Sequence, residues 1–271
     1  MKNKKIFLLL GIMAFAAAVL WAQRRPVLPP SVDRRGVPNW ELDNEMPRDV
    51  FTFVRIRYSS RYGRRSGGWR TDYPDADLNF SYRLQELTSL KVHPEGKVLE
   101  LTDPELFDYP FIYIIEPGAL QFTEPEVIAL RKYLLNGGFL MVDDFWGGRE
   151  YENFAWEMKR VFPDRTPKEL PLEHPIFHCV FDLKEKPQLP SIGQAMRGQD
   201  FEWRPGIDDG SEVHYKGIFD DKNRMMVIIC HNTDLGDGWE REGENQYYFK
   251  TYSEPKAYPM GINIVFYALT H

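Results

Sequence analysis

The sequence predicts an α/β fold built on a mostly parallel sheet, with a β-hairpin added near the C-terminus. Between residues 51 and 162, short apolar segments rich in β-forming residues alternate with amphipathic helical segments, which is typical of a parallel sheet covered by helices. Residues 111–115 are apolar enough to be buried on both faces, as strands of such sheets are. The last third differs, because residues 213–219 and 224–230 flank a polar turn and predict a hairpin.

The individual elements follow from periodicity and from residues that start or stop helices. Thr123 predicts a helix start, because a capping residue, a proline and early acids follow one another there, and Asn136-Gly137 predicts its end. The predicted strands are 51–58, 97–101, 111–115 and 139–142, and the predicted helices are 77–88, 123–135, 151–162 and 262–269.

The N-terminal 48 residues are predicted to lie outside the folded domain. Three lysines precede an uncharged, mostly apolar run at residues 6–22, which is the layout of a secretory signal peptide at 1–22. The run is near the lower length limit of a membrane span, so an uncleaved N-terminal anchor is the alternative. Residues 23–48 are rich in Pro and Arg and are predicted to be a linker or arm, which Trp40 and Leu42 would pin onto the domain at 49–271.

Charge and cysteine content narrow the function classes. Cleavage after Ala22 would remove three lysines and no acids, leaving 31 basic and 40 acidic side chains, a formal net charge of −9. A binder of nucleic acid needs positive charge for phosphate contacts, so that class is disfavoured. Export to the periplasm or cell envelope permits a disulfide between Cys179 and Cys230, but both lie in apolar segments, and two buried free thiols fit equally well.

Acidic side chains follow several of the predicted strands. Asp143 and Asp144 end the strand at 139–142 and precede Trp146, Glu116 follows the strand at 111–115, and the loop after the first strand carries three more acids, Asp72, Asp75 and Asp77. In open parallel sheets, ligands bind in the crevice at the carboxyl edge. These residues are therefore the predicted ligand-binding residues: they would bind a cation or sugar hydroxyls, with Trp146 or Trp69 as a stacking platform.

Structural roles compete with this interpretation. Asp75 or Asp77 could cap the following helix, and Asp143 or Asp144 could cap a helix or pair with an arginine. The acids from Asp75 onward have the spacing of a calcium-binding EF-hand loop, but Phe80 stands where such a loop needs glycine, so an EF-hand is excluded. Other metal motifs are also weak. Pro175 between His174 and His178 argues against a helical zinc pair, so no metal or cofactor is predicted. The polar loop at 231–239 could contribute to a site or simply turn the chain.

Two arginines alternate with apolar residues along the first strand. Thr52, Val54, Ile56 and Tyr58 form the expected core face, and Arg55 and Arg57 share the other face with Phe51 and Phe53. Both faces of a parallel sheet are normally covered, so a charge there needs a partner. The sequence therefore predicts that Arg57 pairs with one of the acids Asp72, Asp75, Asp77, Asp143 or Asp144.

Several motifs together resemble an uncharacterised bacterial family, domain of unknown function number 4159. They are Trp-Arg-Thr-Asp-Tyr-Pro-Asp-Ala-Asp at 69–77, Asp-Tyr-Pro-Phe at 108–111, Leu-Asn-Gly-Gly-Phe-Leu-Met-Val-Asp-Asp at 135–144, His-Pro-Ile at 174–176 and Asn-Thr-Asp-Leu-Gly-Asp-Gly-Trp at 232–239. The resemblance spans roughly residues 50–271. That family is similar to the class I glutamine-amidotransferase-like superfamily, near the trehalose-utilisation type. The resemblance implies a flavodoxin-like three-layer sandwich and brings no known activity.

The resemblance also bears on catalysis. In amidotransferases the nucleophilic cysteine stands on a tight turn directly after the strand equivalent to 139–142, where this chain has Asp143-Asp144. A carboxylate cannot perform the thiolate attack of amide hydrolysis, so the amidotransferase triad does not carry over and no catalytic cysteine is expected.

These observations lead to two expected functions. The first is a non-catalytic binding or assembly component of the bacterial envelope, with a small-molecule or carbohydrate ligand or an envelope protein as partner, no nucleic acid, and membrane contact only through an uncleaved N-terminal segment. The alternative is a hydrolase, possibly on carbohydrate, that uses Asp143 or Asp144 as general acid or base.

Overall fold

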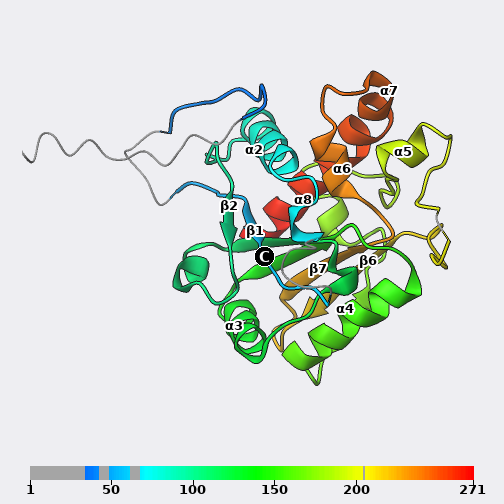
Figure 1. Cartoon of the computed structure of the whole chain (residues 1–271). Coiled ribbons are helices and arrows are strands. Elements are labelled where there is room, and N and C mark those ends of the chain that lie inside the picture. Colours follow the sequence, from blue (N-terminus) through cyan, green and yellow to red (C-terminus); the bar gives the residue numbers. More distant parts are fainter. Residues whose placement is uncertain (1–33, 43–48, 62–67, 204) are drawn as a thin grey trace, which may run out of the picture. The chain divides into compact units, whose positions relative to one another are not determined.

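The computed structural model describes residues 34–42, 49–61, 68–203 and 205–271 (Figure 1). The predicted signal peptide or anchor at 1–22 lies outside these residues, as does most of the predicted arm at 23–48. Within the described ranges, no helix combines the length and the apolar character needed to cross a bilayer.

A seven-stranded sheet in the order β2-β1-β3-β4-β7-β6-β5 forms the centre of the described domain. Neighbours from β2 through to β7 are parallel, while the pairs β7–β6 and β6–β5 are antiparallel. The strands are β1 (Val54–Ile56), β2 (Lys97–Leu99), β3 (Phe111–Ile115), β4 (Phe139–Asp143), β5 (Lys168–Glu169), β6 (His214–Phe219) and β7 (Met225–His231). The parallel part follows the flavodoxin-like 2-1-3-4-5 order, with β7 in the fifth place. The predicted fold class, including the C-terminal hairpin, is confirmed.

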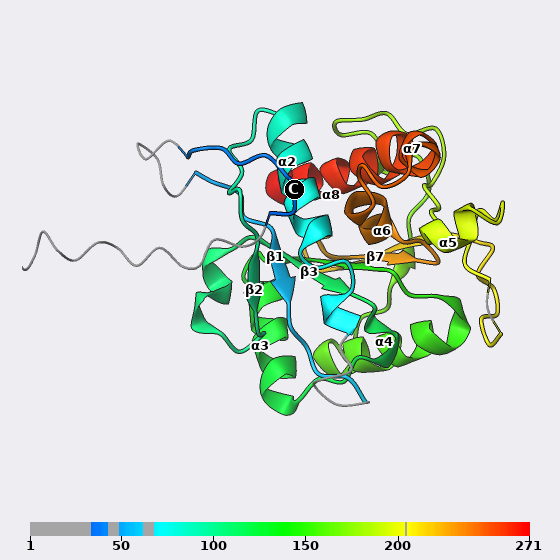
Figure 2. The same ribbon diagram turned by 45° about the horizontal axis from the view of Figure 1, so that its top comes forward.

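Helices cover both faces of this sheet, giving three layers (Figures 1 and 2). One face packs against α2 (Asp75–Leu87) and α8 (Tyr258–Thr270), through a core that includes Phe53 and Tyr113. The other face packs against α3 (Glu124–Leu135) and α4 (Gly147–Val161). The shorter helical segments are η1 (Gly68–Arg70), η2 (Pro104–Asp108), η3 (Pro117–Ala119), η4 (Pro175–Phe177), α5 (Ile192–Ala195), α6 (Leu235–Glu240), α7 (Gln246–Tyr248) and the π-helix η5 (Phe249–Ala257).

Local sequence signals explain where several elements begin and end. Thr123 caps α3 in a reciprocal capping box with Glu126, as its sequence predicts. Gly137 has φ +106°, a left-handed conformation that glycine adopts freely, and ends the turn after α3. Gly138 then enters β4 directly against the ring of Tyr133, where a side chain would collide. These two glycines therefore set the tight connection from α3 into β4.

The prediction for Arg57 is wrong. Arg57 lies beyond the end of β1, is exposed, and pairs with Glu100, with 2.8 Å between Nη2 and Oε1. The buried arginine is its neighbour Arg55, which has no exposed surface and pairs with Asp77 at 2.5 Å. The two arginines share one face of the sequence pattern, but only Arg55 lies under α2, because β1 ends at Ile56.

The described end of the arm contacts the domain through Trp40. Its indole Nε1 donates a hydrogen bond to the carbonyl of Val92 at 2.7 Å, and its ring lies 6.0 Å from that of Tyr82. The two cysteines are separate free thiols. Cys230 is buried on β7, whereas Cys179 is exposed, so the expectation of a buried thiol is wrong at that position.

Candidate functional site

The carboxyl edge of the parallel strands concentrates unusual backbone geometry. The residue directly after each of β3, β4 and β7 is a non-glycine residue in the left-handed region, with φ +47° at Glu116, +54° at Asp144 and +59° at Asn232. Asp72, in the loop after β1, has φ +62°. This conformation costs free energy in non-glycine residues, and residues strained in this way cluster at ligand-binding and active sites. All four turns therefore direct polar side chains toward one edge of the sheet.

A cavity of about 570 Å³ lies at this edge. Asp72, Glu116 and Asp144 all line it, so the structure brings together three of the acids that the sequence singled out. Among its described lining residues, seven carboxylates and three arginines give the cavity a marked excess of negative charge. The charged residues are Asp72, Glu116, Asp144, Glu150, Glu202, Asp234, Asp237, Arg61, Arg149 and Arg241.

Trp146 also lines the cavity, whereas the other predicted residues, Asp75, Asp77 and Asp143, are not among its lining residues. Asp143, the last residue of β4, is fully buried and accepts hydrogen bonds on Oδ2 from the Tyr113 hydroxyl (3.2 Å) and the Gly236 amide (3.0 Å). Burial raises the pKa of Asp143 to about 7, although the backbone hydrogen bonds oppose that shift. Asp143 therefore holds the start of α6 against the sheet.

The acids at 75 and 77 have structural roles, although neither caps α2 as proposed. Asp75 pairs with Arg35 at 2.8 Å, and no side chain caps the helix at its N-terminus. The carboxylate of Asp77 accepts hydrogen bonds from the guanidinium of Arg55. Nη1 of Arg55 also donates to the carbonyls of Trp69 (3.1 Å) and Thr71 (2.9 Å). Arg55 thus ties β1 to α2 and to the loop that delivers Asp72.

Trp146 positions Asp144 instead of serving as an open stacking surface. Only 2% of Trp146 is exposed, and its indole Nε1 donates to Oδ1 of Asp144 at 3.0 Å. The expected stacking platform is therefore covered at Trp146. Its backbone amide donates to Glu150 at 2.9 Å, which links the Asp144 turn to α4.

Residues of the 232–239 loop and α6 complete the site. Asp234 and Asp237 are 5% and 4% exposed, and both line the cavity. Sequence analysis noticed this polar loop without assigning its acids to the site. The signal was present, because Asp234 and Asp237 follow a strand just as Asp144 does. Asn232 anchors the loop, since its Oδ1 accepts from the Gly147 amide at 2.9 Å and its Nδ2 donates to two backbone carbonyls.

Close burial of like charges governs the electrostatics of the cavity. Burial raises the pKa of Asp72 well above its usual value, and the charges of Asp237 and Glu240 raise it further. Burial and the charge of Glu116 act in the same direction on Asp144. Burial also raises the pKa of Glu240, to about 7. Binding of protons, cations or positively charged ligand groups is therefore favoured, because each reduces the repulsion among the ionised carboxylates.

Neither thiol has the properties of a nucleophile. Burial raises the pKa of Cys230 well above its usual value, and the nearby charge of Asp143 adds to the shift. Partial burial of its sulfur also raises the pKa of Cys179, whose Sγ donates to the Asn263 carbonyl at 3.1 Å. Thiolate attack requires the opposite shift.

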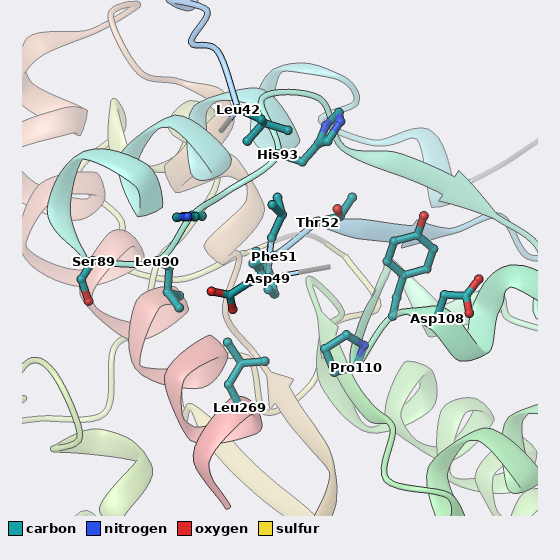
Figure 3. Close-up of a pocket in the computed structure, with 13 residues that line it drawn as sticks. Leu42, Asp49, Phe51, Thr52, Ser89, Leu90, His93, Asp108, Pro110 and Leu269 are labelled. Atoms are coloured by element: carbon teal, nitrogen blue, oxygen red, sulfur yellow. The ribbon is translucent and has the colours of Figure 1, made fainter. Parts of the chain in front are cut away.

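A second, larger cavity of about 990 Å³ lies at the amino edge of the sheet (Figure 3). Its wall includes Phe51 and Thr52 before β1, Pro110 before β3, and Leu269 near the end of α8. Its acids, Asp49 and Asp108, are exposed. The larger cavity thus lacks the buried charge that marks the carboxyl edge.

Comparison with known proteins agrees with the motif pattern. The search of curated proteins finds no match. The model of domain of unknown function DUF4159 matches residues 52–269, which include both sheet edges and every residue of the acidic cavity. The chain therefore belongs to the DUF4159 family.

Proposed function

We propose that this chain is an exported ligand-binding component of the bacterial envelope, and that its ligand occupies the acidic cavity at the carboxyl edge. The observation that carries the proposal is the set of seven carboxylates around one cavity of about 570 Å³, of which Asp72, Asp234 and Asp237 are buried. Buried acids that repel one another destabilise a fold, so a cluster of them points to a functional site. Export rests on the apolar run at residues 6–22.

The charge of the cavity favours a ligand with a positively charged group. A cation placed among these carboxylates relieves their mutual repulsion, whereas a neutral sugar gains only hydrogen bonds. Because Trp146 is covered, stacking on its ring does not support a purely carbohydrate ligand. A small molecule that combines hydroxyl groups with an amine would hydrogen-bond to the carboxylates of the wall and would also relieve their repulsion.

A matched pair of sugars tests this preference. Calorimetric titration with glucosamine, which carries an ammonium group at neutral pH, is expected to show binding, and N-acetylglucosamine, which lacks the charge, is expected to bind at least tenfold more weakly. Asp144→Asn should weaken glucosamine binding, and Asp108→Asn at the other edge should leave it unchanged. Equal binding of both sugars, or loss of binding only in Asp108→Asn, would contradict the proposal.

We also propose a distant similarity of the family to the class I glutamine-amidotransferase-like superfamily. The flavodoxin-like strand order and the left-handed turn directly after β4 support it. Asp144 occupies that turn in place of a nucleophilic thiol, so the proposal extends to ancestry and not to glutamine hydrolysis.

Hydrolysis of a glycoside is a second candidate function, favoured by one observation. Asp144 lines the cavity, and burial beside Glu116 raises the pKa of its carboxyl, as a general acid requires. Release of nitrophenol from a panel of nitrophenyl glycosides, abolished in Asp144→Asn, would establish this activity. No release above the rate of Asp144→Asn would leave binding as the function.

A further inference from the structure

Three carboxylates at the acidic cavity converge closely, with Asp72 and Asp237 on its wall and Glu240 beside it. Asp72, Asp237 and Glu240 each offer an oxygen, and the three oxygens lie within 4.8 Å of one another. Asp237 and Glu240 are three residues apart on α6, so their side chains project from the same face of that helix. Asp72 approaches them from the loop after β1, more than 160 residues earlier in the chain.

The carboxylate of Asp72 is buried and lacks a partner for one oxygen. Its Oδ2 is inaccessible to solvent and has no hydrogen-bond partner among the described residues, and the residue is 8% exposed. A Cβ atom at position 236 would lie 2.5 Å from this oxygen, so glycine there lets the carboxylate lie directly against α6. An unsatisfied buried carboxylate is costly, and a bound cation would supply the missing partner.

The loop that carries Asp72 is held rigidly. Arg55 donates to the carbonyls of Trp69 and Thr71 on the N-terminal side of Asp72, and the Ala76 amide donates to the Asp72 carbonyl at 2.9 Å. The left-handed backbone at Asp72 is therefore fixed on both sides. A ligand set held in this way loses little conformational freedom on binding.

Arg241 neutralises part of the negative charge of this cluster through ion pairs with Asp237 and Glu240, not with Asp72. Its Nε lies 3.2 Å from Oδ1 of Asp237, and its Nη2 lies 2.8 Å from Oε2 of Glu240. Within the described part of the chain, the recorded ion pairs of Arg241 are with Asp237, Glu240 and Glu244, none with Asp72. One guanidinium shared by these acids leaves the three-carboxylate cluster negative.

We propose that Asp72, Asp237 and Glu240 form a binding site for a divalent cation, with Ca²⁺ as the best fit. The three oxygens lie within 4.8 Å of one another, close enough to share one ion. Ca²⁺ accepts six to eight oxygen ligands in flexible geometry, whereas Mg²⁺ demands a near-ideal octahedron, so carboxylates that come from both a loop and a helix suit Ca²⁺ better. Carboxylates are hard ligands, and the described lining of the cavity contains neither His nor Cys, which zinc and copper favour.

This inference deepens the proposed function, because the ion would form one wall of the ligand cavity. A bound Ca²⁺ would convert part of an acidic wall into a coordination centre for ligand hydroxyl or carboxylate oxygens. The ligand class then extends to hydroxyl-rich and anionic molecules when Ca²⁺ is present.

Calorimetric titration of the full chain with CaCl₂, after removal of metal by EDTA and dialysis, tests the site. We expect one ion per chain with half-saturation at or below about 1 mM, the range of extracellular calcium modules, and weaker binding of Mg²⁺. Asp72→Asn should weaken Ca²⁺ binding at least tenfold. Asp75→Asn, a neighbouring acid that pairs with Arg35 outside the cavity, is the matched control and should bind as the wild type does.

The outcomes separate this inference from the proposed function. Absence of Ca²⁺ binding up to about 10 mM, or an equal loss in Asp75→Asn, would overturn the cation site, even if glucosamine still binds. Ca²⁺ binding that depends on Asp72, together with no binding of either sugar, would support the cation site and contradict the proposed sugar preference. Circular dichroism checks that Asp72→Asn folds, and Glu240→Gln replaces it if it does not.

Discussion

The two edges of the central sheet differ in the way they hold their acids. At the amino edge, a cavity of about 990 Å³ has exposed acids, Asp49 and Asp108 (Figure 3). At the carboxyl edge, a cavity of about 570 Å³ is lined by acids that include Asp72, Asp234 and Asp237, each less than a tenth exposed. An exposed carboxylate is stabilised by water at little cost, whereas a buried one needs a partner. Burial of charge therefore supports the carboxyl edge as the candidate site better than cavity size does.

The difference also has a structural foundation. The carboxyl edge is held by Arg55, a fully buried guanidinium that contacts Asp77 and two loop carbonyls. Three strands end there in left-handed residues. These features make the edge rigid and strained at once, as binding and catalytic sites often are.

The largest expected effect comes from removing Arg55. Arg55→Ala leaves the carboxylate of Asp77 buried without its cation, and should lower the free energy of unfolding by about 3–5 kcal/mol in urea denaturation. Arg57→Ala is the control on the same strand end, because Arg57 is exposed in its pair with Glu100, and should cost less than about 1 kcal/mol. Similar losses in both variants would contradict the assignment of Arg55 as the anchor of the site.

The pH dependence of stability tests the buried acid beneath the cavity. Burial raises the pKa of Asp143 to about 7 in the folded chain, so between roughly pH 4 and 7 the folded state holds a proton that the unfolded state has lost. This group therefore stabilises the fold at low pH, and its contribution falls by up to roughly 4 kcal/mol as pH rises to 7.

Denaturation of the wild type and of Asp143→Asn from pH 4 to 8 separates this contribution from those of other groups. We expect the free energy of unfolding of the wild type to fall relative to that of Asp143→Asn as the pH rises across this range. A difference independent of pH would show that Asp143 titrates in the folded chain as an ordinary carboxyl does.

Neutralising one acid of the cavity should stabilise the metal-free protein. Asp72→Asn removes a buried charge that is repelled by Asp237 and Glu240, and should raise the free energy of unfolding at pH 7 by about 1–2 kcal/mol. Asp108→Asn, at the exposed edge, should change it by less than about 0.5 kcal/mol. A loss of stability in Asp72→Asn would mean that its carboxylate already has a stabilising partner.

The smallest effect concerns backbone strain. Glu116→Gly places glycine at φ +47° and should stabilise the metal-free domain by about 1 kcal/mol in thermal denaturation. Asn223→Gly, at φ +63° in the turn between β6 and β7, is the control, because asparagine tolerates this region better and should gain less. Equal gains would remove strain as a distinguishing feature of the carboxyl edge.

Sequence patterns predicted the framework because its signals are local. The capping box at Thr123, Gly137 after α3 and the alternation of apolar strands with helices each act within a few residues. They gave the correct order of the main strands and helices, without β5, α5, α6 and α7. The same logic placed Glu116 and Asp144 at one edge, since both directly follow parallel strands.

The rest depends on contacts between distant segments. The sequence could not distinguish Arg55 from Arg57, because the end of β1 decides which of them α2 covers. Helix α6 was missed because it contains two glycines, which disfavour helices in isolation. Gly236 is needed because Asp72 packs against it, a contact that no local pattern reveals. Asp237 and Glu240 were consequently left out of the predicted site.

The most direct test of the central claim compares indole N–H signals at the two edges by NMR. Trp146 donates to Asp144 in the acidic cavity, and Trp40 donates to Val92 near the amino edge, so each indole reports on its own edge. One sample of the metal-free chain is titrated with CaCl₂, and a separate sample is titrated with glucosamine. We predict that the Trp146 signal shifts and the Trp40 signal stays in place. Movement of the Trp40 signal alone, or of neither signal with both additions, would contradict the claim that the carboxyl edge is the binding site.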